Sequence, residues 1–525
     1  MNPANRNAEN LYTDGPSLSH PSSENPETGF EPLPTPLRFD AGKGSEQHAT
    51  HRSIEAVLET AGFSPYQIRA IYYGNWLRDY SQLLDPKIVR AVGTPKNFPD
   101  VLSREALTKI VDVLAVREFT DLMSQERAPF VVTPEKLGVY RPSEHIDNPK
   151  PANAERTYPR QIDADFEDWV APDDASLQVD PETSMKIYIQ RSVDFMTGEM
   201  NTAMNQGPDS PDGLRAFGSA LHVLEDFFAH SNFVELSLRK LGYTEVLPWT
   251  SRADCKHGLP LVTGTFGGSD IIASLAAPLG KVLFSTDDKP FEATQAGVRY
   301  ERDQIIDILL GEHPDQKWFD AHQTFLHARD DWASLEYSEQ AEKIFAIIGT
   351  PARIAGNAIG TAVQGLTVLF GNSVDDVQTA LGDDPNTSGS TNPSHSQLAK
   401  DHGEHPLHSL AALLAEKAVL HVSQAMQGQW HGKPGAQDPA QVAANYFVHP
   451  MDSDWQDALV SEWAQSNSKL VNRAASKSEL DNVHKEVRAS AEKGLTRFKN
   501  ESSSFLSIFS GVTSVKDVWN IITGK

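Results

Sequence analysis

The stretch that decides the fold is one helical pattern near the middle of the chain. It reads Ala220-Leu221-His222-Val223-Leu224-Glu225-Asp226-Phe227-Phe228-Ala229-His230-Ser231-Asn232-Phe233. At about 100° per residue, His222, Asp226 and His230 share one narrow arc of a helix. Apolar residues lie on roughly the opposite side, namely Phe217, Leu221, Leu224 and Phe228. The pattern predicts a helix that packs through one face and can bind metal through the other.

The rise of this helix indicates more than one metal ion. At about 1.5 Å per residue, His222 and His230 are separated by about 12 Å along the axis. Zinc–nitrogen bonds are only about 2.0 to 2.1 Å long, so one zinc ion cannot readily hold both imidazoles. We therefore expect His222 and Asp226 to share one ion and His230 to reach a second, with Asp226 as a bridge.

The same pattern has a structural alternative, because a polar arc opposite an apolar stripe is also typical of a solvated helix surface. Val223 and Phe227 widen the apolar arc and imply deeper burial. Buried histidine and aspartate side chains need partners. For this motif alone the solvated surface is the expected structure; metal binding is favoured once the order of the other candidate ligands, given below, is added.

Composition indicates a folded, mainly helical protein. The chain has 525 residues, of which 39% are hydrophobic and 22% charged, so one large domain with appended segments or two to three smaller units are expected. Helical periodicity recurs in several segments. They are 54–61, 66–77, 104–122, 185–196 and 214–238. The sequence therefore predicts an all-α fold.

We divide the chain into three parts. Residues 1–45 are rich in Pro, Ser, Asn and Glu and are expected to form a disordered tail. Residues 46–435 are assigned to the helical domain, and 436–525 to a helical extension. Within the domain, 344–372 is apolar with many small residues, which favours core packing or an amphipathic surface helix over membrane contact. Residues 375–393 have the composition of a loop.

Charge and cysteine content narrow the function. Acidic residues outnumber basic ones 71 to 46, giving a net charge of -25, which opposes nucleic-acid binding and unaided docking on anionic membranes. A site rich in divalent cations could still accept a phosphodiester. Cys255 is the only cysteine among 525 residues, so metal ligands must be His, Asp or Glu. No export signal is visible, and we expect a cytoplasmic protein, with membrane association or delivery to other cells as alternatives.

Five segments resemble the HET-C family, which is named for a fungal heterokaryon-incompatibility protein. They are 71–82, with Gly74-Asn75-Trp76-Leu77-Arg78-Asp79-Tyr80, 137–150, with Pro142-Ser143-Glu144-His145-Ile146-Asp147-Asn148-Pro149, 222–236, 260–268 and 393–402. HET-C proteins in turn look like distant relatives of zinc-dependent phospholipase C and of a single-strand zinc nuclease. The resemblance implies an all-helical, phospholipase C-like core that holds three zinc ions.

The resemblance also implies a series of metal ligands that this chain supplies in the same order. The series is His51, Asp79, His145, His222, Asp226, His230 and His395. By the same resemblance, Asp79 is the candidate catalytic residue, a general base that activates a zinc-bound water.

Three of these assignments have alternatives. His51 opens His51-Arg52-Ser53-Ile54-Glu55, where Ser53 departs from the His-Gly-Asp-Ile-Glu of the family, and His48 is a competitor. Asp79 follows Arg78, so a buried salt bridge with an arginine is possible. His145 lies in a Pro-flanked segment and could be a turn histidine bonded to the backbone.

The end of the ligand series departs from the family pattern. Phospholipase C members finish with His-xxx-Glu, but Ala399 stands four residues after His395. Asp401 and His402 could substitute, and the pair His327 and Asp331 is an alternative. The secreted phospholipases also bind one zinc through their terminal amine, whereas 50 residues precede His51 here. We therefore expect two or three zinc ions.

Together these features predict a zinc-dependent phosphodiester hydrolase. We expect phospholipase C-like cleavage of phospholipid head groups on a membrane surface, with a toxic or self-recognition role. One alternative is a non-catalytic incompatibility protein that binds a membrane or an unidentified protein partner and has a structural metal site. A second is a single-strand nuclease, which the net charge disfavours.

Overall fold

Helix α9, Pro211–His230, is the element on which the other helices of the site assemble. The Ser210 side chain caps it by accepting a hydrogen bond from the Gly213 N–H, and Pro211 occupies its first turn. From Gly213 to His230, every residue is buried except Arg215. A helix buried all round belongs to the core rather than to the surface. The predicted helix is confirmed over Pro211–His230, and a solvated polar face is ruled out for it. The helical pattern expected over 214–238 is interrupted at Ser231 and Asn232.

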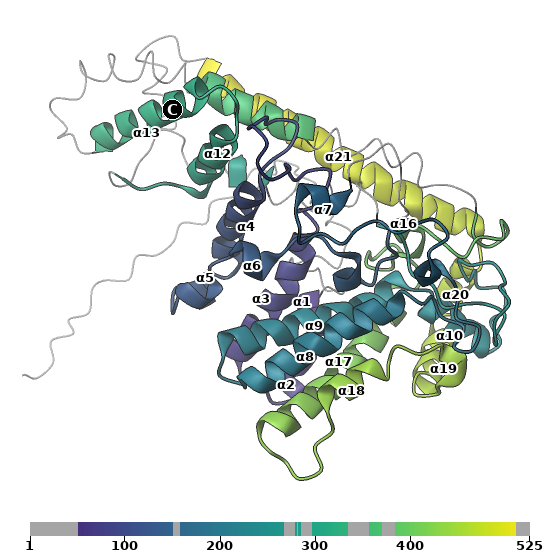
Figure 1. Ribbon diagram of the computed structural model, residues 1–525. Coiled ribbons are helices and arrows are strands. Elements are labelled where there is room, and N and C mark those ends of the chain that lie inside the picture. The colour runs from purple at the N-terminus through teal and green to yellow at the C-terminus, as the bar shows by residue number, and fades with distance from the viewer. Residues whose placement is uncertain are drawn as a thin grey trace, which may run out of the picture. The chain divides into compact units, whose positions relative to one another are not determined.

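The computed structural model describes residues 51–150, 158–266, 279–280, 282–284, 297–333, 356–369 and 384–510. These residues are mainly helical (Figure 1), so the predicted all-α fold is confirmed. They fall in one compact unit, 35–525. The tail predicted for 1–45 lies outside the described residues, and the boundary at 435 stays a prediction.

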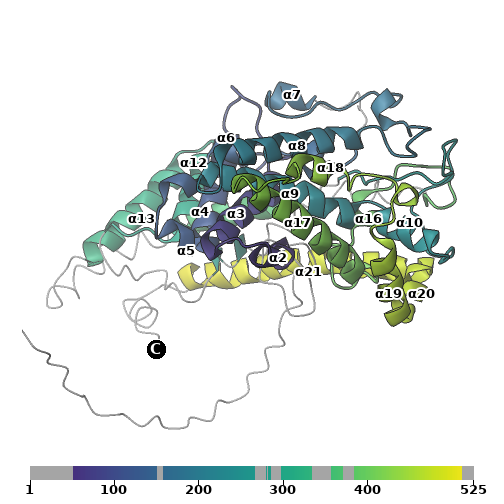
Figure 2. The ribbon, with the colours of Figure 1, turned by 90° about the horizontal axis from the view of Figure 1, so that it is seen from below.

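Three long helices surround α9. They are α3 (Pro65–Ser81), α8 (Ile189–Gln206) and α17 (His408–Trp430), and each packs directly against α9 (Figures 1 and 2). The backbones of α3 and α9 approach each other closely. A Cβ added at Gly218 would lie 1.8 Å from the Ile71 carbonyl oxygen, and one added at Gly74 would lie 2.0 Å from the Arg215 carbonyl oxygen. Two glycines therefore let the two backbones touch.

The other named elements range from single turns to the long helix α21. In chain order they are α1 (His51–Ile54), α2 (Val57–Thr60), α4 (Arg104–Glu118), α5 (Thr120–Met123), η1 (Ala128–Phe130), α6 (Pro134–Leu137), η2 (Pro142–His145), α7 (Pro159–Ile162), η3 (Ala175–Leu177), α10 (Phe233–Lys240), α12 (Glu301–Gly311), α13 (Lys317–Ala333), α16 (His395–Leu398), α18 (Pro439–Ala444), η4 (Pro450–Asp452), α19 (Asp457–Ser466), α20 (Ser468–Ala474) and α21 (Lys477–Ser510). The region after 435 is thus helical over its described residues.

An extended strip, 261–265, crosses the end of α9. It pairs through isolated bridges, Met185 with Leu261, Ser231 with Thr263, and Thr265 with Ser394. Asn232, just after α9, fixes the start of the strip, because its side chain accepts a hydrogen bond from the Val262 N–H at 2.8 Å. The strip therefore connects the end of α9 to the segment that begins α16.

The small-residue segment 344–372 is described only over 356–369, which is helical. One side of this helix is buried, with Ala358, Ala362 and Leu366 among its core residues. Gly365 faces the Phe98 ring so closely that an added Cβ would lie 2.3 Å from it. This part of the segment therefore packs into the core, as one of the two expectations had it. Over the whole described chain, no helix has the combination of length and apolar character needed to cross a membrane.

Candidate metal centre

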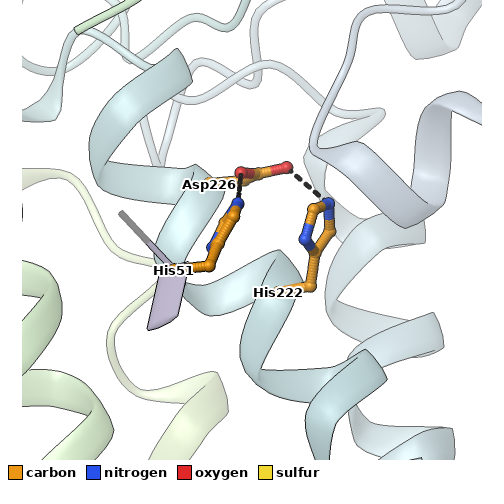
Figure 3. Close-up of side chains that lie close together, drawn as sticks. All are labelled: His51, His222 and Asp226. Carbon is orange, nitrogen blue, oxygen red and sulfur yellow. Dashed lines mark ion pairs between the residues drawn. The ribbon is translucent and has the colours of Figure 1, made fainter. Parts of the chain in front are cut away.

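The first group of candidate ligands consists of His51, His222 and Asp226. His51 comes from α1, and the other two lie one turn apart on α9. One ligand atom from each lies within 4.8 Å of the other two. The Nε2 atoms of His222 and His51 are 3.0 and 3.7 Å from the Asp226 carboxylate, and Figure 3 shows both rings directed at it. This donor set suits a transition metal such as zinc.

The second group consists of His230, His395 and Asp401, which also offer ligand atoms within 4.8 Å of one another. His230 Nε2 lies 3.9 Å from Asp401 Oδ2. The rings of His230 and His395 stack with their centroids 4.2 Å apart. His230 ends α9 and His395 begins α16, so residues far apart in sequence meet here.

Asp226 lies between the two groups. Its Oδ1 is 3.7 Å from His51 Nε2 and 3.6 Å from His230 Nε2, while its Oδ2 is 3.0 Å from His222 Nε2. One carboxylate thus faces histidines of both groups. The structure places Asp226 where a bridging ligand would stand, as the helical spacing predicts.

His145 and Asp79 border the first group. His145, in η2, has its Nδ1 3.0 Å from His222 Nε2 and 3.9 Å from Asp226 Oδ2. Its other nitrogen lies 3.1 Å from the Ser81 hydroxyl, so side chains rather than the backbone hold this histidine. Asp79 Oδ1 is 3.8 Å from His51 Nε2, and its side chain is 20% exposed. It is the more exposed of the acids in this group.

Arg78, which precedes Asp79 in the sequence, forms an ion pair with a different carboxylate. Arg78 forms a buried ion pair with Glu144 and donates to the carbonyl of Leu137 at 2.7 Å. The guanidinium therefore braces η2 against α6, and the arginine next to Asp79 already has a buried carboxylate of its own.

The candidates for the last ligands of the series lie in different places, and only one of them joins the second group. Asp401 belongs to the second group, whereas His402 is in neither group and its buried ring lies 5.8 Å from that of His405. His327 is exposed on α13, and the side chain of Asp331 lies outside the described residues, as does His48. Among the described residues, His395 with Asp401 is the pair that meets His230.

Sequence reasoning missed a layer of residues behind the ligands. Asp147 Oδ1 lies 3.0 Å from His395 Nδ1, and the Tyr140 hydroxyl donates to Asp147 Oδ2 at 2.9 Å. Glu225 and Asn75 play the same part for His51 and His222. Hydrogen-bond partners of this kind orient metal-binding imidazoles. The signal was their position: Asp147 follows His145 closely, and Glu225 precedes Asp226.

The extended strip brings the second group together. Gly264 accepts a hydrogen bond from the Asn148 N–H at 2.7 Å, and Thr265 accepts one from the His395 N–H at 3.0 Å. A Cβ added at Gly264 would lie 2.4 Å from the Cα of His395. Only glycine lets the strip pass this close to α16.

We expect Gly264→Ala to lower the metal content by about one ion per chain, because it pushes His395 away from His230 while leaving the first group intact. Elemental analysis after zinc loading measures this. Gly198→Ala is the matched control, since an added Cβ there meets nothing within 4 Å. An unchanged zinc content in Gly264→Ala would contradict the role given to the strip.

Burial sets the protonation of the centre. Desolvation lowers the pKa values of His145, His222 and His230 well below the usual histidine range, so these imidazoles are neutral and can offer a lone pair at neutral pH. Burial acts in the opposite direction on Asp226 and raises its pKa to about 8. In the metal-free protein a proton occupies this carboxyl group at neutral pH.

We therefore expect zinc affinity to rise with pH up to about 8. The ion must displace the Asp226 proton below that pKa, which costs about tenfold in affinity for each pH unit. Above it the carboxylate is already ionised and the affinity levels off. Competition with a chelator of known pH dependence measures the profile. A profile that is flat below pH 8 would show that Asp226 does not release a proton on binding.

Residues 46–205 and 189–287 match the family described as Heterokaryon incompatibility protein Het-C. The match supports the resemblance seen in the sequence and contains the candidate ligands from His51 to His230. His395 and Asp401 lie beyond it. No curated protein and no solved structure matches the chain.

Proposed function

We propose that this chain, which is similar to the Het-C family over residues 46–287, is a metal-dependent phosphodiesterase that cleaves the head groups of phospholipids. The observation that carries the proposal is the pair of buried His/His/Asp groups joined by Asp226. Two neighbouring cation sites that share a carboxylate are typical of enzymes that hydrolyse phosphate esters.

The donor atoms fit zinc. They are imidazole nitrogens and carboxylate oxygens, and zinc prefers such ligands in sites of low coordination number. His51, His222 and Asp226 would hold one ion, and His230, His395 and Asp401 a second, with His145 and Asp79 available to either the first ion or a third. When bound, zinc polarises phosphoryl oxygens and lowers the pKa of a coordinated water.

The protein's own part in the reaction falls to Asp79. Its carboxylate lies at the edge of the first group and is partly exposed, so it can accept a proton from the attacking water. The water oxygen forms a bond to phosphorus as the bond between phosphorus and the leaving oxygen breaks. The leaving oxygen then takes a proton from solvent. The buried histidines contribute ligands and not protons, since their lowered pKa values keep them neutral.

Charge favours a phospholipid over a nucleic acid. With a net charge of -25, the surface repels a long polyanion, whereas a single phosphodiester group needs only the local cations. The family description, heterokaryon incompatibility, is consistent with a role in self-recognition or conflict between cells. We propose the membrane surface as the place where the substrate is met.

The test is hydrolysis by the zinc-loaded full-length chain. Vesicles of phosphatidylcholine and of phosphatidylethanolamine are expected to release phosphorylated head groups, and single-stranded DNA and RNA to remain intact. Nucleotide release in place of head groups would make the chain a nuclease. Zinc bound at full occupancy with no hydrolysis of any of these would instead indicate a structural metal site.

Asp79→Asn separates catalysis from metal binding. We expect it to reduce head-group release by about 100- to 10,000-fold, the usual contribution of a general base, while the first and second groups keep their zinc. Release rates are compared with zinc content in the same preparation. Full activity in Asp79→Asn would remove Asp79 from the mechanism.

A further inference from the structure

Asn75 of α3 stands behind two ligands of the first group. Its Oδ1 lies 2.9 Å from His222 Nδ1, and its Nδ2 donates to Glu225 Oε2 at 3.2 Å and to Glu55 Oε1 at 2.9 Å. All of these side chains are buried. Glu225 Oε2 in turn lies 2.5 Å from His51 Nδ1. One amide therefore connects the rear nitrogens of His222 and, through Glu225, of His51.

The two glutamates decide which way the amide points. An NH2 group between two carboxyl groups donates to both, whereas a flipped amide would place its oxygen against their oxygens. The Asn75 oxygen must therefore face His222. That oxygen can only accept, so His222 carries its proton on Nδ1, and its Nε2 lone pair is directed at Asp226.

The same reasoning applies to His51. Glu225 Oε2 lies 2.5 Å from His51 Nδ1, and with Glu225 as the acceptor of this hydrogen bond the lone pair of His51 is on Nε2. That atom lies 3.7 Å from Asp226 Oδ1 and 3.8 Å from Asp79 Oδ1. Both histidines of the first group thus present Nε2, the nitrogen that faces the other ligands.

We infer that Asn75 is a positioning residue that fixes the Nδ1–H tautomers of His222 and, together with Glu225 and Glu55, of His51, so that the first group is preorganised for a metal ion. The inference rests on the metal centre of the proposed function but not on phosphodiester hydrolysis. The second group is independent of Asn75, because the partner of His395 Nδ1 is Asp147.

The first test uses the metal-free wild-type chain. Nitrogen-15 NMR of labelled histidine distinguishes the two tautomers, and the His222 and His51 signals are identified from His222→Gln and His51→Gln. We expect both rings to carry the proton on Nδ1. In Asn75→Leu we expect His222 to change to the Nε2–H form, whereas Asn75→Asp, which keeps an acceptor oxygen, is expected to retain the Nδ1–H form. An Nε2–H tautomer of His222 in the wild type would overturn the inference.

The second test measures zinc affinity of each group separately, with Asp401→Asn isolating the first group and His51→Gln the second. Asn75→Leu is expected to weaken zinc binding by the first group about 10- to 100-fold, as outer-shell changes do, and to leave the second unchanged. Asp147→Leu is the matched reciprocal variant and should weaken only the second. Equal weakening of both groups by Asn75→Leu would mean general destabilisation and overturn the inference. A wild-type chain that binds no zinc would instead defeat the proposed function, while the tautomer measurement would still decide on Asn75.

Discussion

Asp226→Asn is expected to abolish metal binding by both groups at once. The Asp226 carboxylate faces His51 and His222 on one side and His230 on the other. An amide offers one neutral oxygen where two ions require a shared, charged ligand. We therefore expect the affinity of each group for zinc to fall by more than about 100-fold, which is the upper end for changes behind a ligand.

The fold should survive this substitution. Burial raises the pKa of Asp226 to about 8, so the carboxyl group of the metal-free protein is neutral at pH 7 and an amide of the same shape replaces it. Elemental analysis gives the zinc content, and circular dichroism of the metal-free chain confirms folding. Asp212→Asn is the control, since Asp212 is on the same helix with a side chain 63% exposed. Loss of only one ion from Asp226→Asn would refute the bridging role.

The α9 half of the centre could be read from the sequence because it is local. The positions of His222, Asp226 and His230 depend only on helical periodicity, and the apolar residues between them require burial. The candidate ligands outside α9, such as His51 and His145, could be assigned only from the resemblance to a family. Nothing in the local pattern around His51 or His145 indicates that their rings meet 4.8 and 5.0 Å from that of His222.

The choice between Asp401 and His402 shows why the other ligands could not be predicted from the sequence. These two residues are adjacent in an irregular segment, where no period determines which side chain points inwards. The buried side chain of Lys400 decides it. Its Nζ donates to the Ser231 carbonyl at 2.7 Å and to Glu235 at 3.0 Å. The backbone N–H of Lys400 donates to the Ala229 carbonyl at 3.0 Å. Lys400 thus ties this segment to the end of α9, which places Asp401 beside His230.

The contact between α3 and α9 at Gly74 and Gly218 could not be predicted from the sequence either, since the two glycines are 144 positions apart (218 minus 74). Their importance depends on two helices touching, which periodicity cannot show. α3 carries Asn75 and Asp79, and α9 carries three ligands. The distance between these helices therefore determines how Asn75 and Asp79 lie against the first group.

Gly218→Ala is accordingly expected to be among the most destabilising single substitutions in this chain. Its Cβ would lie 1.8 Å from the Ile71 carbonyl oxygen and 2.8 Å from the Asn75 backbone nitrogen. Backbone atoms cannot move aside as a side chain can, so the helices must separate and lose their packing. We expect a loss of about 3 kcal/mol or more in the free energy of unfolding.

Urea unfolding of the metal-free chain measures this loss, and zinc titration measures its effect on the site. Gly198→Ala, on α8 with open space around the added Cβ, should instead be neutral or stabilising by about 0.5 to 1 kcal/mol, because alanine is the better helix former. Separation of α3 from α9 should also draw Asn75 away from His222, so zinc affinity of the first group should fall more than that of the second. A Gly218→Ala chain with wild-type stability would mean that α3 and α9 do not touch at this point.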